Sequence, residues 1–101
     1  MLSSSGRQYQ LRLYTVREGE LDQFVAEWAA QVLPLRREFG FEVLGPWVHD
    51  EESLFVWILS YGGDFEAADA AYYESDERRG LTPDPARRLT ESQHWLLRPV
   101  G

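Results

Sequence analysis

The chain has 101 residues, of which 44% are hydrophobic and 14% aromatic, and this composition predicts one folded domain over residues 1–101, with an ordered core over about residues 8–100. Its net charge of −7 disfavours nucleic acid or an anionic membrane as a partner, because few basic side chains are left to meet phosphates. Residues 1–6 are too short and polar for a signal peptide, and no apolar stretch reaches the roughly 20 residues of a membrane span. We therefore expect a cytoplasmic protein.

Three residue types are missing from the chain: cysteine, lysine and asparagine. Their absence excludes disulfides, thiolate nucleophiles and Schiff-base chemistry, and any mechanism that needs an asparagine side chain.

The first half of the chain predicts a strand, a helix and a second strand. Residues 8–16 alternate with period two, as in a strand whose two faces differ. The helix that follows carries an apolar stripe at steps of three and four residues: Leu21, Phe24, Val25, Trp28, Val32 and Leu35. Pro34 lacks a backbone donor, so we expect a kink or a loosened last turn before Gly40 ends the helix. Residues 41–48 predict the second strand.

A third strand is predicted over residues 53–61, and both of its faces are apolar. One face carries Leu54, Val56 and Ile58, and the other carries Phe55, Trp57, Leu59 and Tyr61. Two helices cover about one face of a small sheet. We therefore expect the aromatic face to meet a partner subunit, a ligand or both.

Residues 49–52 predict the turn of a hairpin between the second and third strands. With this turn, Trp47 lies opposite Phe55 and Gly45 opposite Trp57, which places Trp47 and Trp57 on one face. A slip of one residue would reverse that assignment.

The second half of the chain predicts a helix, a short turn and a last strand. Asp64 is the expected N-cap of a helix with a narrow face of Phe65, Ala68, Ala71, Tyr72 and Ser75. Residues 78–83 connect it to a turn opened by Asp84-Pro85, and residues 93–100 form the fourth strand. With right-handed crossovers, this order predicts an α+β, ferredoxin-like βαββαβ sandwich.

Several stretches resemble the NIPSNAP family of dimeric α/β barrels. They are Tyr9-x-Leu11-Arg12-x-Tyr14-x-Val16, Gly19-x-Leu21-Asp22-x-Phe24 with Trp28, Gly40-Phe41 with Leu44-Gly45-x-Trp47, and residues 55–61 and 67–73. The resemblance implies a homodimer of two ferredoxin-like subunits joined sheet to sheet, with a cavity between sheet and helices or within the barrel. Where many members carry a His and a Trp on the third strand, this chain has Trp57 and Leu59. Related haem-degrading enzymes rely on an Asn, which this chain lacks.

The candidate ligand-binding residues are Arg12, Tyr14, Trp47, Trp57 and Tyr73. Arg12 shares a strand face with Tyr14, and a buried guanidinium needs an acceptor, which is either a ligand oxygen or a protein carboxylate, for instance across a dimer interface. We favour the ligand. Trp47 and Trp57 are candidates to form an aromatic wall against a planar apolar ligand, although aromatic residues more often fill cores and dimer interfaces. Tyr73 could reach a cavity mouth or solvent.

The candidates for proton transfer are His94 and Tyr14. His94 follows Ser92 on one strand face, but such neighbours lie about 6.5–7 Å apart, too far for a nucleophile and its base. His94 is therefore a candidate lone base, or simply an edge-strand histidine. We expect no metal at residues 49–52, whose side chains point in different directions, and no cofactor.

Two functions remain open on this basis. The first is a homodimeric barrel that binds a small apolar or aromatic molecule without chemistry. The alternative is a cofactor-independent monooxygenase or isomerase for an aromatic or polyketide-like substrate, in which Arg12 stabilises an oxyanion and His94 or Tyr14 moves a proton. Arg12 and His94 converging in one pocket would favour the enzyme, whereas an Arg12 paired within the protein would favour a structural role.

Overall fold

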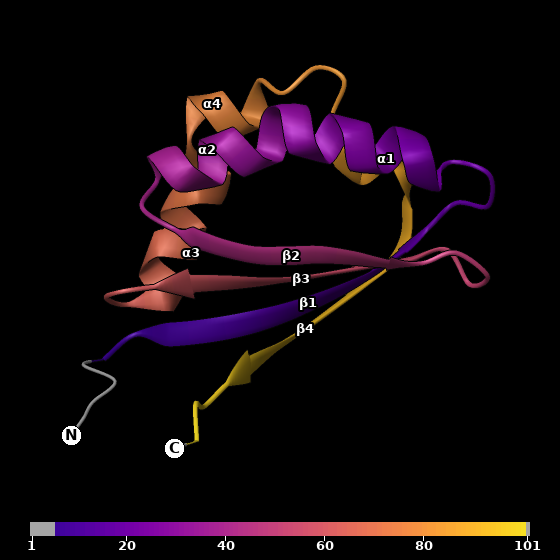
Figure 1. Cartoon of the computed structure of the whole chain (residues 1–101). Coiled ribbons are helices and arrows are strands. Elements are labelled where there is room, and N and C mark those ends of the chain that lie inside the picture. The colour runs from indigo at the N-terminus through magenta and orange to yellow at the C-terminus, as the bar shows by residue number, and fades with distance from the viewer. Residues whose placement is uncertain (1–5, 101) are drawn as a thin grey trace.

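A four-stranded antiparallel sheet with its helices on one face makes up the computed structural model, which describes residues 6–100 (Figure 1). The elements are β1 (Gln8–Val16), α1 (Leu21–Glu27), a π-helical turn η1 (Trp28–Val32), α2 (Leu33–Glu38), β2 (Glu42–His49), β3 (Leu54–Tyr61), α3 (Phe65–Glu74), α4 (Asp76–Arg79), a 3-10 turn η2 (Pro85–Arg88) and β4 (Leu89–Leu97). The strand order is β2-β3-β1-β4. The predicted α+β, ferredoxin-like fold is confirmed.

Residues 1–5, on which the expectation about a signal peptide largely depends, lie outside the described residues. Between residues 6 and 100, none of the helices combines the length and the apolar character needed to cross a bilayer.

The long helical segment over α1, η1 and α2 changes its hydrogen-bond pattern midway. The backbone N–H of Leu33 donates to the carbonyl of Trp28, five residues back, as in a π-helix. Pro34 follows at the start of α2, so its missing donor falls where the α-helical pattern has already been interrupted. The irregularity attributed to Pro34 is therefore present, but its predicted place was wrong: it precedes the proline, and the last turn is α-helical.

The aromatic face of β3 lies beneath the helices. Phe55, Trp57 and Leu59 are at most 1% exposed. The centre of the Phe55 ring lies 4.9 Å from that of Phe24. The centre of the Trp28 ring lies 5.1 Å from those of Phe55 and Trp57. The expectation that this face meets a partner subunit is therefore wrong. Both faces of the strand are apolar, and period-two alternation alone does not tell which one the crossover helices cover.

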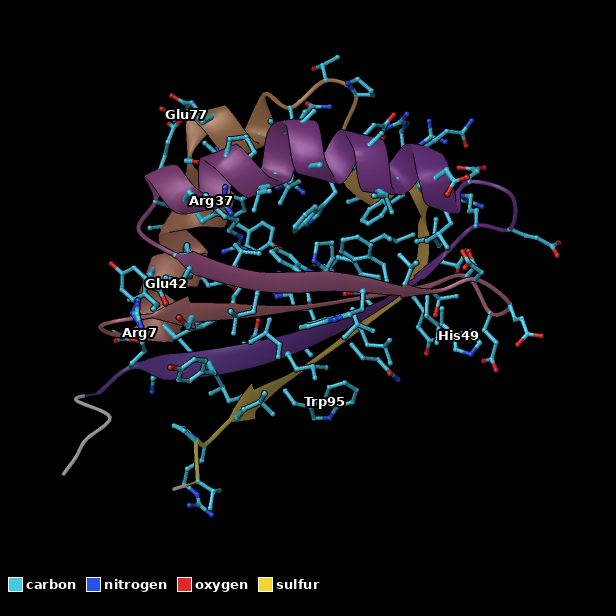
Figure 2. The ribbon with its side chains drawn as sticks, in the orientation of Figure 1. Arg7, Arg37, Glu42, His49, Glu77 and Trp95 are labelled. Atoms are coloured by element: carbon cyan, nitrogen blue, oxygen red, sulfur yellow. The ribbon has the colours of Figure 1, made fainter. Side chains whose placement is uncertain are left out.

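The other face of the sheet, called here the open face, is covered by no element of the described chain (Figure 1). Leu11 at its centre pairs with Ile58 of β3 and Trp95 of β4, so these three side chains share that face. Trp95 is 48% exposed and points away from the helices (Figure 2). The surface also includes Leu13, Leu44, Trp47, Leu54, Val56 and Leu97.

A bulge in β2 corrects the predicted hairpin register. Trp47 lies opposite Val56, and Leu44 lies opposite Ile58, so Gly45 and Pro46 together face one residue of β3. Gly45 has φ of +93°, and a Cβ there would lie 2.8 Å from the Trp47 ring. The bulge turns Trp47 onto the open face, where it is 55% exposed. Trp47 and Trp57 therefore lie on opposite faces, and the predicted shared face was wrong.

Two predicted caps are confirmed in the second half of the chain. The Asp64 side chain accepts a hydrogen bond from the Ala67 backbone, and the Asp84 side chain accepts one from Ala86. The last strand begins at Leu89, earlier than predicted. After Leu89, the next residues, Thr90 and Glu91, are polar and exposed, so this part of the strand carries no apolar alternation that could reveal it.

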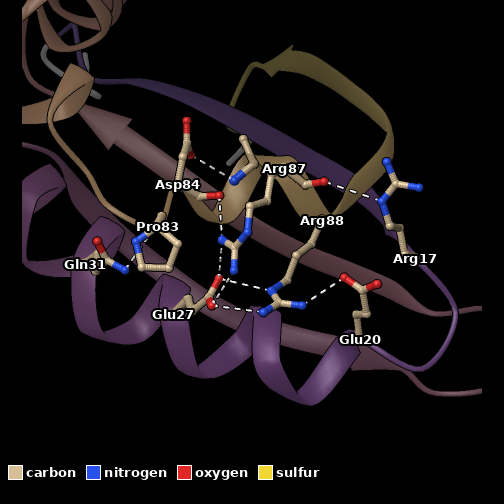
Figure 3. Close-up of polar contacts among 9 residues, drawn as sticks. Arg17, Glu20, Glu27, Gln31, Pro83, Asp84, Arg87 and Arg88 are labelled. Carbon is tan, nitrogen blue, oxygen red and sulfur yellow. Dashed lines mark hydrogen bonds and ion pairs between the residues drawn. The ribbon is translucent and has the colours of Figure 1, made fainter.

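Charged side chains fasten η2 to α1 (Figure 3). Both Arg87 and Arg88 make paired hydrogen bonds to the Glu27 carboxylate, with nitrogen–oxygen distances of 3.0 to 3.1 Å. Arg88 also donates to Glu20 at 2.9 Å. Hydrogen bonds from Arg87 and Arg88 lower the pKa of Glu27 to about 2. The segment just before β4 is therefore fixed against the first helix.

The core position of Trp28 gives a first prediction. Trp28 is 2% exposed, so Trp28→Ala should open a cavity and lower the free energy of unfolding by about 3–5 kcal/mol in urea denaturation. Gln23→Ala, on the exposed side of the same helix, is the control and should leave the midpoint nearly unchanged. A Trp28→Ala midpoint near that of the wild type would contradict this packing.

The Glu27 contacts predict a pH dependence. Because the pKa of Glu27 is lowered on folding, these contacts stabilise the fold above about pH 5 and are lost as the pH falls towards 2. Glu27→Gln should therefore be less stable than the wild type at pH 7, and the difference should shrink on acidification in thermal melts. Glu38→Gln, at an exposed carboxylate outside these contacts, is the control. A difference that stays constant from pH 7 to pH 2.5 would refute the role of Glu27.

Candidate functional site

A cavity of about 380 Å³ lies between the helices and the sheet. Its aromatic lining consists of Tyr14, Phe24, Trp28, Trp57, Tyr72 and Tyr73. Its charged and hydroxyl-bearing lining consists of Arg36, Arg78, Thr90, Glu91 and Ser92. Pro85, Ala86 and Leu89 also line it, so the segment that Glu27 fixes to α1 forms part of the wall. The volume lies in the range of sites for small organic molecules.

Arg12 lies on β1 beneath the helices, is 5% exposed, and has protein partners for all three nitrogens. Its Nε donates to Gln10 at 2.7 Å, its Nη1 to the Tyr73 hydroxyl at 2.7 Å, and its Nη2 to Asp69 Oδ1 at 3.0 Å. Burial opposes the charged form, but Tyr14, Tyr73 and Asp69 more than offset it, so the pKa of Arg12 is raised. The acceptor that the sequence required is thus an aspartate of the same chain.

Arg36 is a second buried guanidinium, and the sequence interpretation did not single it out. It is 1% exposed, and its Nη1 lies 2.8 Å from the same Oδ1 of Asp69 that Arg12 contacts. Its Cζ lies 3.7 Å from the centre of the Tyr72 ring and 4.7 Å from that of Phe41, in cation–π contact. Unlike Arg12, Arg36 lines the cavity.

A signal for both missed residues does exist in the sequence. Arg36 comes four residues after Val32 on the apolar stripe of the first helical segment, and Asp69 comes four residues after Phe65 in α3. Residues four apart share a helix face, so the spacing indicates that both charged side chains point towards the core. The neighbouring run Arg36-Arg37-Glu38 resembles an exposed helix end, which hid this signal.

Several polar atoms around the cavity have no hydrogen-bond partner among the described residues. They are Trp28 Nε1, Arg36 Nε and Nη1, Trp57 Nε1 and the Tyr72 hydroxyl, and of these Arg36 Nη1 is in ion-pair contact with Asp69 at 2.8 Å. Leaving such a group unpaired costs about 1–3 kcal/mol, so each calls for an acceptor supplied by a ligand or by water. Burial raises the pKa of Tyr72 to about 12, which keeps its hydroxyl protonated and able to donate. Residues of the cavity wall therefore carry several buried donors that lack a partner among residues 6–100.

The structure gathers some of the predicted site residues and separates others. Tyr14, Trp57 and Tyr73 line the cavity, and the Tyr73 hydroxyl accepts a hydrogen bond from Arg12. Burial raises the pKa of Tyr14 as well, against the opposing effect of the Arg12 charge. Trp47 lies on the open face, away from these residues.

His94 pairs with Arg12 across the sheet, but it is exposed and is not among the residues that line the cavity. Its neighbour Ser92 does line the cavity. His49 lies at the far end of the β2–β3 hairpin (Figure 2), where its Nδ1 accepts a hydrogen bond from the Glu52 backbone at 3.4 Å. His94, the predicted base, is thus absent from the residues that line the cavity, and His49 lies far from them at the hairpin.

Comparisons with known proteins agree with this architecture. An uncharacterized NIPSNAP domain protein from Burkholderia xenovorans is 16% identical, with a TM-score of 0.80 over 92% of this chain and 94% of that one. A NIPSNAP family protein of unknown function from Agrobacterium tumefaciens is 12% identical, with a TM-score of 0.83 over 96% and 91%. A Nitrosomonas europaea protein named as an antibiotic biosynthesis monooxygenase is 13% identical, with a TM-score of 0.71 over 96% and 93%. At these identities the likeness shows the fold alone.

Sequence comparison decides the family. No curated protein matches the chain significantly. The model of the NIPSNAP family, in contrast, matches residues 9–94, which is most of the sequence. The chain therefore belongs to the NIPSNAP family.

Proposed function

We propose that this protein is a homodimeric NIPSNAP barrel that binds a small apolar or aromatic molecule in the cavity between sheet and helices. The observation that carries the proposal is the cavity of about 380 Å³, which has an aromatic lining. Trp28, Trp57 and Tyr72 in this lining carry donors that have no partner within the described part of the chain. A pocket of mainly aromatic walls with a few polar groups is typical of sites for small organic ligands. The aromatic rings supply apolar contact, and the donors orient an acceptor group of the ligand.

Within this proposal the candidate residues take different roles. Tyr14, Trp57 and Tyr73 contact the ligand. Arg12 positions Tyr73 and Asp69, since its donors are already bonded to protein groups. Trp47, half exposed on the open face, is assigned to the dimer interface instead.

The open face is the surface through which we propose that two subunits join. Its centre is apolar, and Leu44, Trp47, Trp95 and Leu97 are each 40% to 55% exposed. Large exposed apolar patches on a folded chain mark interaction sites. A shallow hollow of about 230 Å³, lined by Tyr9, Leu44, Ile58 and Leu97 among others, offers room for side chains of a second copy.

A cofactor-independent monooxygenase or isomerase is the second candidate function. It is favoured by the hydroxyl of Tyr14, which lines the cavity close to the Arg12 guanidinium, 3.5 Å from Nη1. The raised pKa values of Tyr14 and Tyr72 suit these hydroxyls to donating to an oxyanion rather than to abstracting a proton. Since His94 lies outside the lining, Glu91 would have to serve as the base, and we therefore place binding first.

A bulky side chain placed in the cavity wall should block ligand binding. We expect members of a panel of naphthalene and quinoline derivatives to shift the indole N–H resonances of Trp28 and Trp57, but not those of Trp47 and Trp95 on the open face. Ala86→Phe, in the cavity wall, should weaken that binding at least tenfold, about 1.4 kcal/mol. Ala29→Phe, on the exposed side of η1, is the matched control and should bind like the wild type. A panel that shifts neither Trp28 nor Trp57 would overturn the binding function.

The dimer makes a separate prediction. Sedimentation should give about twice the 11.7 kDa chain mass at micromolar concentration, and an obligate interface would bury about 2,000 Å² or more. Ile58→Asp, at the centre of the open face, should yield monomers, while Ala29→Asp, on the helix surface, should leave the dimer intact. A wild-type chain that sediments as a monomer would refute the proposed assembly.

A further inference from the structure

The buried guanidinium charges beside the cavity outnumber the carboxylate that they contact. Arg12 Nη2 and Arg36 Nη1 lie 3.0 and 2.8 Å from one and the same oxygen, Oδ1 of Asp69. Both guanidinium side chains are at most 6% exposed. Two buried positive charges thus share a single carboxylate, which leaves one positive charge in excess.

The other charged groups of the cavity wall leave this excess in place. Arg78 pairs with Asp84 at 3.2 Å, so these two charges compensate each other. Glu91 lies on β4, where it is exposed to solvent, and makes no ion pair among residues 6–100. A buried charge without compensation is strongly destabilising, so a site of this kind favours an occupant of opposite charge.

Arg36, rather than Arg12, has donor capacity left for that occupant. The three nitrogens of Arg12 bond to Gln10, Tyr73 and Asp69. Arg36 Nε is buried and has no hydrogen-bond partner among residues 6–100. Arg36 lines the cavity with Trp28 and Tyr72, whose side-chain polar atoms also lack a partner in that range. A guanidinium beside neutral hydrogen-bond donors is a typical binding site for a carboxylate.

We propose that the ligand of the cavity is a monoanion with a planar aromatic ring system and one carboxylate, and that this carboxylate binds to Arg36. The inference rests on the proposed binding function and names its ligand class. One excess charge matches one carboxylate, and the aromatic walls formed by Tyr14, Trp28 and Trp57 suit a planar ring. Neutral aromatic molecules of the same shape bind more weakly, because they leave the Arg36 charge uncompensated.

The test compares two probes of equal shape, 2-naphthoate and 2-naphthamide, by isothermal titration calorimetry at pH 7.5. The wild-type protein should bind the naphthoate at least tenfold more tightly than the amide, a difference of about 1.4 kcal/mol. In the same samples, both probes should shift the indole N–H resonances of Trp28 and Trp57, and only the naphthoate should shift the Arg36 Nε–H resonance strongly.

A pair of neighbouring variants isolates the charge. Arg36→Met should reduce naphthoate affinity to that of the amide while amide binding changes by less than about threefold. Arg37→Met removes the same charge from an exposed neighbour and should leave both affinities unchanged. If Arg36→Met does not fold, the comparison of the two probes on the wild-type protein and the Arg36 Nε–H shift still decide the question.

The outcomes separate this inference from the function on which it rests. If the two probes bind with equal affinity and both shift the indole N–H resonances of Trp28 and Trp57, the anionic ligand class is wrong. The proposed binding function of the cavity would still hold. A naphthoate preference that persists in Arg36→Met would overturn Arg36 as the receptor. If neither probe perturbs Trp28 or Trp57 at millimolar concentration, both proposals fall.

Discussion

The Asp69 carboxylate ties the two layers of this protein together. It lies on α3 and meets Arg12 from the sheet and Arg36 from α2, so one oxygen joins a strand and two helices. Through these arginines it also fixes two tyrosines, because Arg12 donates to the Tyr73 hydroxyl and Arg36 lies on the Tyr72 ring. Removing the carboxylate would leave two buried guanidiniums without a counter-charge, a change that is strongly destabilising. The position of α3 over the sheet, and hence one wall of the cavity, depends on this interaction.

The two faces of the sheet serve different purposes in the proposed function. The face towards the helices carries the ordered aromatic core and the cavity, and the open face carries the apolar surface for a second copy. Side chains alternate between the faces along each strand, so neighbouring residues such as Trp57 and Ile58 belong to different sites. Substitutions on the open face can therefore change assembly without changing the residues that line the cavity.

Local signals in the sequence predicted most of the elements, because each had a physical cause within a few residues. The N-caps Asp64 and Asp84 and the period-two pattern of β1 are of this kind. The errors concerned choices that local pattern does not fix. Both faces of β3 are apolar, so its burial side depended on the crossovers, and the bulge at Gly45 shifted Trp47 to the other face of the sheet.

The candidate site was predicted only in part, because local pattern identifies some of its residues and not others. Tyr14, Trp57 and Tyr73 line the cavity, and all three were assigned to the correct strand or helix. The face of β3 that carries Trp57 was expected to meet a partner subunit, a ligand or both, and it lies beneath the helices instead. Arg36 was missed because a charged residue next to Arg37 and Glu38 resembles an exposed helix end, although its spacing from Val32 places it on the buried stripe. The pairing of Arg12 with Asp69, 57 residues apart, is a tertiary contact that no local pattern specifies.

A crystal structure of the protein grown with 2-naphthoate tests the central claim most directly. The carboxylate should lie about 2.7–2.9 Å from a nitrogen of Arg36, with the ring system in the cavity against Trp28 and Trp57. Asp69 should keep its contacts with both arginines. Naphthoate bound only on the open face, or a cavity closed by side chains in its presence, would contradict the claim that the helix-covered face is the ligand site.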